Sequence, residues 1–152
     1  MVLGEREAAV EISAPLLAQY WSPSPQFALG QALRGKATAA LDISDGLLAD
    51  CGHIAKASRL ALEVNLAEVP VSSALVAFSG PAAARQAALT GGDDYVLVFT
   101  LPPQQLPALR DAGLAVHVIG RAVAGEGVIL RDEHGQDITP RQRGYQHFRE
   151  TP

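Results

Sequence analysis

The amino-acid sequence predicts an α+β fold in which a mixed β-sheet is layered with helices. Segments with the apolar pattern of strands alternate with segments of helical spacing for most of the chain. The strands predicted late in the chain follow one another closely, so a purely parallel sheet is not expected. The chain has 152 residues, of which 48% are hydrophobic and 18% charged, and this balance predicts one soluble, folded domain.

Two short helices are predicted before the first strand. Ser13 can cap a helix over residues 14–20, with Pro15 tolerated in its first turn. A second helix carries Phe27 and ends at Gly35, because glycine favours the left-handed conformation that often ends a helix.

A strand, a polar turn and a helix are predicted next. Residues 37–43 form a nearly continuous apolar run, which predicts a strand buried on both faces. The polar turn occupies residues 42–46. Apolar residues then recur every three or four positions over residues 47–58, which predicts an amphipathic helix.

The middle of the chain is predicted to contain a strand and two helices. Residues 60–66 alternate well enough for a strand, and residues 70–78 are expected to form a loop with a short helix. Pro81 precedes an alanine-rich helix over residues 82–89, because proline fits the first turn of a helix. That helix breaks at residues 90–94, which are rich in glycine and aspartate.

The last third of the chain is predicted to contain strands, a helix and a hairpin. Residues 95–101 are the clearest strand, because β-branched and aromatic residues fill its centre. A helix over residues 103–112 and a strand over residues 114–119 follow. A strand over residues 127–130 and a turn at residues 132–135 predict a final hairpin.

Charge and hydropathy exclude several classes of protein. The formal net charge of −4 and the pI near 5.5 provide no basic surface for nucleic acid or an anionic membrane. No apolar stretch approaches the roughly 20 residues that a membrane span needs, and charges at residues 5–7 interrupt a signal peptide. The single cysteine, Cys51, cannot form an internal disulfide, so a cytoplasmic location is expected.

Asp42, Ser44 and Asp45 lie where the predicted strand gives way to the predicted helix. Open α/β sheets place their ligands at the carboxyl ends of strands. Carboxylate oxygens suit Mg²⁺, which completes its shell with water and substrate phosphates. Ser44 and the first N–H groups of the helix are then placed to hold phosphate oxygens, and Gly46 lets the backbone come close.

Helix capping is an alternative role for these residues. Serine and aspartate are preferred N-caps, and most such residues have no other role. Asp42 favours a metal site instead, because a carboxylate inside an apolar strand is costly unless it is paired or bound to a cation.

A second acidic turn, residues 91–94, contains Gly91, Gly92, Asp93 and Asp94. Paired glycines allow a positive φ or the close approach of a ligand, although a turn that only links a helix to a strand explains them equally well. The two turns together are more informative, because a shared face of the sheet would gather four carboxylates around one cation-dependent anion site.

The remaining reactive side chains are weaker candidates. His53 on a predicted helix, His117 in a strand and His134 in a turn lack the paired spacing of metal ligands. Cys51 has no basic neighbour in sequence that would lower its pKa, so an inert, buried thiol is expected. The sequence contains no P-loop, dinucleotide fingerprint or Gly-x-Ser-x-Gly elbow.

Three segments resemble, in order and spacing, the C-terminal half of the thiamine-monophosphate kinase family: residues 40–50 (ALDISDGLLAD), 91–97 (GGDDYVL) and 144–148 (GYQHF). The first alone indicates only the wider superfamily of aminoimidazole-ribonucleotide-synthetase-like proteins. The second and third point to the kinases. The resemblance covers nearly the whole chain, and it implies that residues 1–152 are a single C-terminal ATP- and substrate-binding domain that lacks the family's N-terminal domain.

The resemblance implies ATP-dependent phosphorylation of thiamine monophosphate to thiamine diphosphate, by direct in-line transfer assisted by several Mg²⁺ ions. Asp42 and Asp45 resemble magnesium ligands, and Ser44 resembles an ATP contact. Asp93 and Gln142 stand at positions that bind substrate in the family. No residue is assigned a covalent catalytic role.

The sequence departs from the family pattern near the substrate. The family usually has glutamate where Asp93 and Val96 stand. Asp93 therefore keeps the negative charge on a shorter side chain, whereas Val96 has no charge. Gln142 and Arg143 stand where an aromatic residue normally precedes the glycine of the last segment.

The missing N-terminal domain has a physical consequence under this interpretation. Phosphoryl transfer depends on positioning and on cations that neutralise phosphate oxygens, so the chain alone is expected to be inactive or nearly so. The full-length protein is expected to be a homodimer formed through that domain. Two alternatives stay open: a non-catalytic ligand-binding module whose acidic turns only cap helices, and another synthetase of the superfamily.

Overall fold

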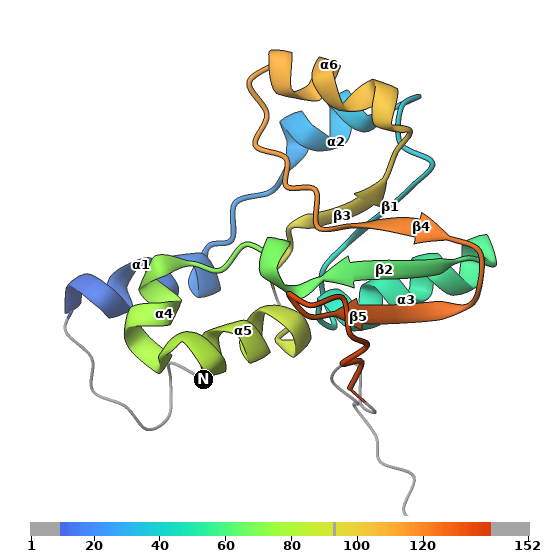
Figure 1. Cartoon of the computed structure of the whole chain (residues 1–152). Coiled ribbons are helices and arrows are strands. Elements are labelled where there is room, and N and C mark those ends of the chain that lie inside the picture. The colour runs from blue at the N-terminus through green and yellow to red at the C-terminus, as the bar shows by residue number, and fades with distance from the viewer. Residues whose placement is uncertain (1–9, 93, 141–152) are drawn as a thin grey trace, which may run out of the picture.

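The computed structural model describes residues 10–92 and 94–140 and confirms the predicted α+β class (Figure 1). The helices are α1 (Val10–Trp21), α2 (Phe27–Leu33), α3 (Leu47–Ser58), α4 (Ser73–Ser79), α5 (Pro81–Thr90) and α6 (Leu106–Asp111), with 3₁₀ turns at Leu66–Glu68 and Pro103–Gln105. The strands are β1 (Ala39–Asp42), β2 (Ala61–Asn65), β3 (Leu97–Thr100), β4 (Gly120–Val123) and β5 (Gly127–Arg131). None of the helices in the described ranges combines the length and hydrophobicity that crossing a membrane requires.

The strands form two sheets rather than one. β1 and β3 pair in antiparallel orientation, with Ala39 opposite Thr100 and Asp42 opposite Leu97. In the other sheet β2 is central, and it pairs antiparallel with β4 and parallel with β5. The predicted mixed sheet is therefore confirmed for β4-β2-β5, whereas β1 and β3 form a separate antiparallel sheet.

Strands β4 and β5 are the two arms of a hairpin that is opened to admit β2 between them. Residues 124–126 connect the arms across the start of β2, where Ala61 lies opposite both Val123 and Gly127. Gly125 adopts a positive φ of 133°, and a β-carbon there would lie 3.2 Å from the Ala61 methyl group. Glycine therefore gives the crossing loop both the conformation and the space that it needs.

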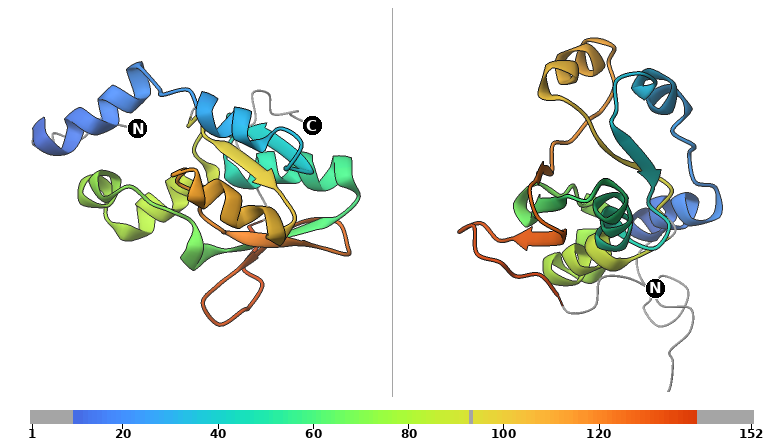
Figure 2. Two further views of the ribbon diagram at one scale, coloured as in Figure 1. Left: turned by 90° about the horizontal axis from the view of Figure 1, so that it is seen from above. Right: turned by 90° about the vertical axis from the view of Figure 1, so that its right-hand side faces the viewer.

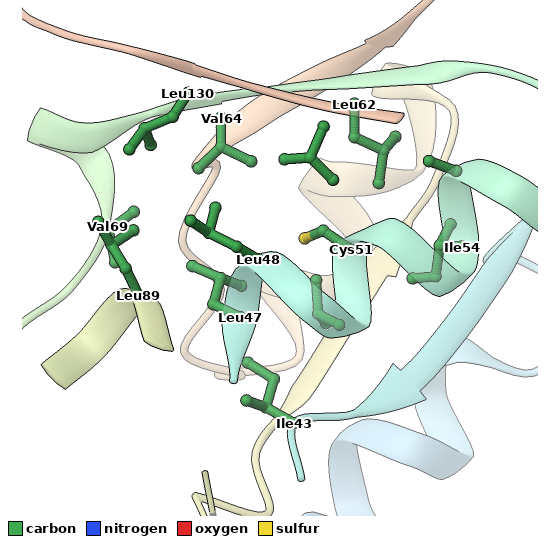
Figure 3. Close-up of a cluster of buried hydrophobic side chains, with 13 residues drawn as sticks. Ile43, Leu47, Leu48, Cys51, Ile54, Leu62, Val64, Val69, Leu89 and Leu130 are labelled. Atoms are coloured by element: carbon green, nitrogen blue, oxygen red, sulfur yellow. The ribbon is translucent and has the colours of Figure 1, made fainter. Parts of the chain in front are cut away.

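Helix α3 forms the centre of the hydrophobic core because it contacts both sheets. Figure 3 shows Leu48 and Cys51 of α3 directed toward Val64 and Leu130, which lie on β2 and β5. Leu48 is fully buried. Packing of this kind fixes the position of α3 and, with it, the position of the loop that precedes the helix.

A second cluster covers one face of β3. Helices α2 and α6 lie side by side there (Figures 1 and 2), and Leu29, Leu33 and Leu109 are buried against Leu97 and Phe99 of the strand. This cluster fixes the position of α2 against β3, and no residue of the three-stranded sheet belongs to it.

The prediction that residues 37–43 form a strand buried on both faces is wrong. β1 has four residues whose burial alternates, with Ala39 and Leu41 packed against the core and Ala40 and Asp42 exposed. The cluster formed by α2, α6 and β3 covers Leu97 and Phe99, but it does not cover their β1 partners Asp42 and Ala40. An apolar sequence therefore did not imply burial on both faces.

Several predicted boundaries also differ from the structure. α1 includes residues from Val10 onward and carries Pro15 inside the helix, whereas the predicted helix covered residues 14–20. Residues 114–119 form no strand, because Leu114 and Val116 pack against the α2–α6 cluster instead of pairing with a sheet. The helix predicted over residues 47–58 is confirmed at both ends.

On the outer face of the three-stranded sheet, Glu63 of β2 forms ion pairs with both neighbouring strands. Arg121 Nε donates to its Oε2 at 2.7 Å, and Arg131 Nη2 donates to its Oε1 at 2.9 Å. The hydrogen bond from Arg121 first, and then that from Arg131, lower the pKa of Glu63 below its usual value of 4.5. A carboxylate with a lowered folded pKa stabilises the fold above its unfolded pKa, and this stability is lost as the pH falls through the folded pKa.

Replacing Glu63 with glutamine is therefore expected to lower the melting temperature at neutral pH, because the ion pairs across three strands are lost. The difference from the wild type should shrink as the pH falls below about 4.5, where the wild-type carboxylate also becomes protonated. Melting curves followed by circular dichroism at several pH values measure both effects, with Glu126→Gln in the exposed β4–β5 loop as control. A difference that stays constant with pH would contradict this account of Glu63.

Candidate functional site

The acidic loop, which we define as residues 42–46, connects β1 to α3 and contains three of the predicted site residues. The N-cap of α3 is Gly46, which has a φ of 104° and no side chain. Ser44 and Asp45 precede this position, so the structure does not support the alternative in which they are N-caps. Within the described ranges, neither the Ser44 hydroxyl nor the Asp45 carboxylate makes a hydrogen bond, which leaves both available to a ligand.

Asp50, in the first turn of α3, holds the acidic loop in place. Its Oδ2 accepts hydrogen bonds from the backbone N–H groups of Ser44, at 3.0 Å, and Asp45, at 3.1 Å. The Asp50 N–H donates to the carbonyl of Gly46 at 3.0 Å. Asp50 is only 2% exposed. The backbone N–H groups of Ser44 and Asp45 are thus already hydrogen-bonded to a side chain of the protein.

Cys51 follows Asp50 on α3 and is buried in the core. Burial, with the negative charge of Asp50 as a second cause, raises the pKa of Cys51 to about 12. The thiolate is the nucleophilic form of cysteine, so this thiol is inert near neutral pH. The predicted inert, buried cysteine is confirmed.

The acidic loop and the second acidic turn meet at one end of the β1–β3 sheet. Because these strands are antiparallel, the segment after β1 and the segment before β3 lie at the same end. Pairing continues beyond the strands, since Ile43 N–H donates to the Val96 carbonyl at 2.8 Å and Tyr95 N–H donates to the Ile43 carbonyl at 2.9 Å. The convergence that the sequence analysis required is therefore present, although it comes from an antiparallel pair.

Two glycines allow the two turns to touch. A β-carbon on Gly46 would lie 2.9 Å from the carbonyl carbon of Thr90, which ends α5. A β-carbon on Gly92 would overlap the carbonyl oxygen of Ser44. From the sequence, these glycines were expected to allow the approach of a ligand or a particular turn geometry. Their lack of a side chain also lets one turn pack directly on the other.

A cluster of possible cation ligands lies beside the acidic loop. One carboxylate oxygen each from Asp45 and Asp50 and a ring nitrogen of His53 all lie within 4.8 Å of one another. No metal-binding role was predicted for His53 from the sequence, and Asp50 was not among the predicted site residues. The signal was their three-residue spacing, which places both side chains on one side of α3. This arrangement offers a divalent cation two oxygens and one nitrogen.

Asp42 does not belong to that cluster. It is exposed at the end of β1, so the argument that it is a carboxylate confined to an apolar strand is wrong. Its place at the end of the strand still puts it at the same end of the sheet as Asp45. The predicted substrate residues Asp93 and Gln142 lie outside the described residues, and Asp94, which follows Asp93 in sequence, is exposed.

A surface hollow of about 710 Å³ lies on the outer face of the three-stranded sheet. Its lining includes Glu63 and the two arginines that pair with it, Arg121 and Arg131, and no residue of the acidic loop. The candidate site is therefore the open rim formed by the acidic loop and the adjoining turn.

The fold and the acidic loop define a class of domain. Residues 25–133 match the family model of the AIR synthase related protein, C-terminal domain, and the chain belongs to this family. The matched range contains the acidic loop, α3 and the turn before β3.

Relatives of this chain are thiamine-monophosphate kinases, as the three sequence segments predicted. The enzyme of Escherichia coli (strain K12) is 42% identical over 139 residues, which are 88% of this chain and 42% of the relative. The crystal structure of the kinase from Stenotrophomonas maltophilia K279a matches 82% of this chain and 41% of its own, with a TM-score of 0.75 and 40% identity. AaThiL complexed with AMPPCP and TMP matches 94% of this chain and 44% of its own, with a TM-score of 0.78 and 29% identity. The chain thus spans less than half the length of these relatives.

Substituting alanine for Gly92 is expected to push the two turns apart, because the new methyl group would overlap the Ser44 carbonyl oxygen. We expect a loss of about 1–3 kcal/mol in the free energy of unfolding, measured by urea denaturation. Gly52→Ala is the matched control, since a β-carbon at this helical position meets nothing within 4 Å. Equal stability of the two variants would show that the turns are not in contact.

Proposed function

We propose that this chain is the C-terminal part of an ATP- and Mg²⁺-dependent kinase that phosphorylates thiamine monophosphate to thiamine diphosphate. The observation that carries the proposal is the contact between the acidic loop and the turn before β3 at one end of the sheet. Relatives named thiamine-monophosphate kinase support it. One solved relative holds AMPPCP, an analogue of ATP, together with TMP.

The acidic loop fits a hard divalent cation such as Mg²⁺. Its side chains offer oxygen donors, and the Asp45 carboxylate has no competing hydrogen bond within the described part of the chain. In this proposal Asp42 and Asp45 are the magnesium ligands. Bound there, Mg²⁺ would neutralise phosphate oxygens of the nucleotide and attach them to the loop.

The charge of the chain explains why nucleotide binding needs a cation. The formal net charge is −4, and the acidic loop concentrates carboxylates at the proposed site, so a bare triphosphate would be repelled. Ser44 is the proposed ATP contact, because its hydroxyl can donate to a phosphate oxygen. The N–H groups of Ser44 and Asp45 are already bound to Asp50 and do not take this role.

Direct transfer between the two substrates agrees with the side chains at this site. Cys51 is the only cysteine of the chain, and its burial and raised pKa of about 12 remove it as a nucleophile. In the proposal Asp93 and Gln142 contact the thiamine substrate. A cytoplasmic location and a homodimer formed through an N-terminal domain complete the proposal, and both rest on the family resemblance and composition.

Asp45→Asn in the full-length kinase is expected to reduce turnover on the order of 100-fold, because one anionic ligand of the phosphate-bound cation is lost. The melting temperature should change little, since the Asp45 side chain makes no hydrogen bond within the described ranges. Formation of thiamine diphosphate at saturating ATP and Mg²⁺ is the measurement.

Asp111→Asn, an exposed substitution on α6, is the control and should leave turnover unchanged. Normal turnover of Asp45→Asn combined with an altered melting temperature would sink the proposal. That result would instead favour a non-catalytic module whose acidic residues serve the structure alone.

A further inference from the structure

We propose that Asp50 is a positioning residue, which fixes the backbone of the acidic loop so that Ser44 and Asp45 present their side chains to nucleotide and cation. The inference rests on the proposed function. It concerns a residue to which the sequence motifs assigned no role, and it follows from the contacts of the Asp50 carboxylate.

The carboxylate of Asp50 binds the loop rather than the helix that carries it. Asp50 is the fourth residue of α3, and an acidic side chain in a first turn commonly binds the free N–H groups of its own helix. Here Oδ2 accepts from Ser44 and Asp45, two consecutive residues before the N-cap. The hydrogen bonds therefore stabilise one conformation of the loop.

The side-chain bonds are what distinguish Asp50. Its backbone N–H donates to the Gly46 carbonyl, which is the ordinary i→i−4 bond of the first helical turn, whereas the bonds from the Ser44 and Asp45 N–H groups need its carboxylate. With its N–H held by Asp50, the backbone of Asp45 has a fixed position, and its carboxylate oxygen lies within 4.8 Å of an Asp50 oxygen.

The burial of Asp50 argues against a role in core packing alone. Among the described residues, Asp50 is the only charged residue that is buried. Its neighbours Leu47, Leu48 and Cys51 are buried apolar residues of the same helix. A buried carboxylate is costly unless it accepts hydrogen bonds, and apolar residues of similar volume usually stabilise a core at least as well. What Asp50 provides that an apolar residue lacks is the pair of bonds to the acidic loop.

Two substitutions separate the hydrogen bonds from the charge. Asp50→Asn keeps an oxygen that can accept from both N–H groups but removes the negative charge, whereas Asp50→Ala removes both. Asp132→Ala is the matched control, because Asp132 Oδ1 also accepts two backbone N–H bonds, from His134 at 2.9 Å and Gln136 at 2.8 Å, in a turn that follows β5.

The experiment titrates the ¹⁵N-labelled chain with Mn²⁺, as a paramagnetic substitute for Mg²⁺, and follows the broadening of the Ser44 and Asp45 amide signals. Amide hydrogen exchange at the same two residues reports the loop conformation directly. We expect Asp50→Ala to raise the Mn²⁺ concentration for half-broadening roughly 10-fold or more and to abolish amide protection. Asp50→Asn should stay within about threefold of the wild type and keep the protection, because an amide oxygen still accepts both bonds.

The other outcomes contradict either the positioning role or the proposed function. Equal Mn²⁺ binding by Asp50→Ala and the wild type overturns the positioning role. Loss of binding in Asp50→Asn with the loop amides still protected also overturns it, because Asp50 would then act through its charge. No broadening of Ser44 or Asp45 in the wild type counts against the proposed function, and the positioning role falls with it. A loss of binding in Asp132→Ala equal to that in Asp50→Ala would show that the effect is not specific to the acidic loop.

Discussion

The antiparallel pairing of β1 with β3 is the constraint on which the candidate site depends. It brings a segment near residue 45 and a segment near residue 92 to the same end of one short sheet. The hydrogen bonds of Ile43 with Tyr95 and Val96 extend this pairing into the two turns. Backbone bonds therefore hold the two turns together, and within the described ranges the Ser44 hydroxyl and the Asp45 carboxylate make no hydrogen bond.

Helix α3 connects the core to the rim. Its buried side packs on both sheets, while its first turn binds the acidic loop through the Asp50 carboxylate. The first turn of this helix thus contributes both Leu47 and Leu48 to the core and the Asp50 carboxylate to the loop. A change that shifts α3 within the core would be transmitted to the loop through rigid contacts, since close-packed interiors deform little.

The sequence predicted the helices best where spacing and punctuation agreed, as in α3, which follows Gly46 and repeats apolar residues every three or four positions. The prediction was wrong where an apolar segment could either pair in a sheet or pack against helices without forming a strand. Residues 114–119 are apolar apart from His117 and were predicted to be a strand, yet Leu114 and Val116 pack against α2 and α6. Both acidic turns were found from residue type, but Asp50 was not, because only tertiary packing shows that a carboxylate on a helix is buried and turned back toward the preceding loop.

The opened hairpin of β4 and β5 has a consequence for how the chain folds. Strands β4 and β5 do not pair with each other as a local hairpin in the native sheet, because β2 lies between them. The central strand must find partners that are distant in sequence, as the 58 and 68 residues that separate Glu63 from Arg121 and Arg131 illustrate. Closing such long loops costs chain entropy before any pairing compensates for it. We therefore expect the three-stranded sheet to be completed late in folding, after the helices have formed locally.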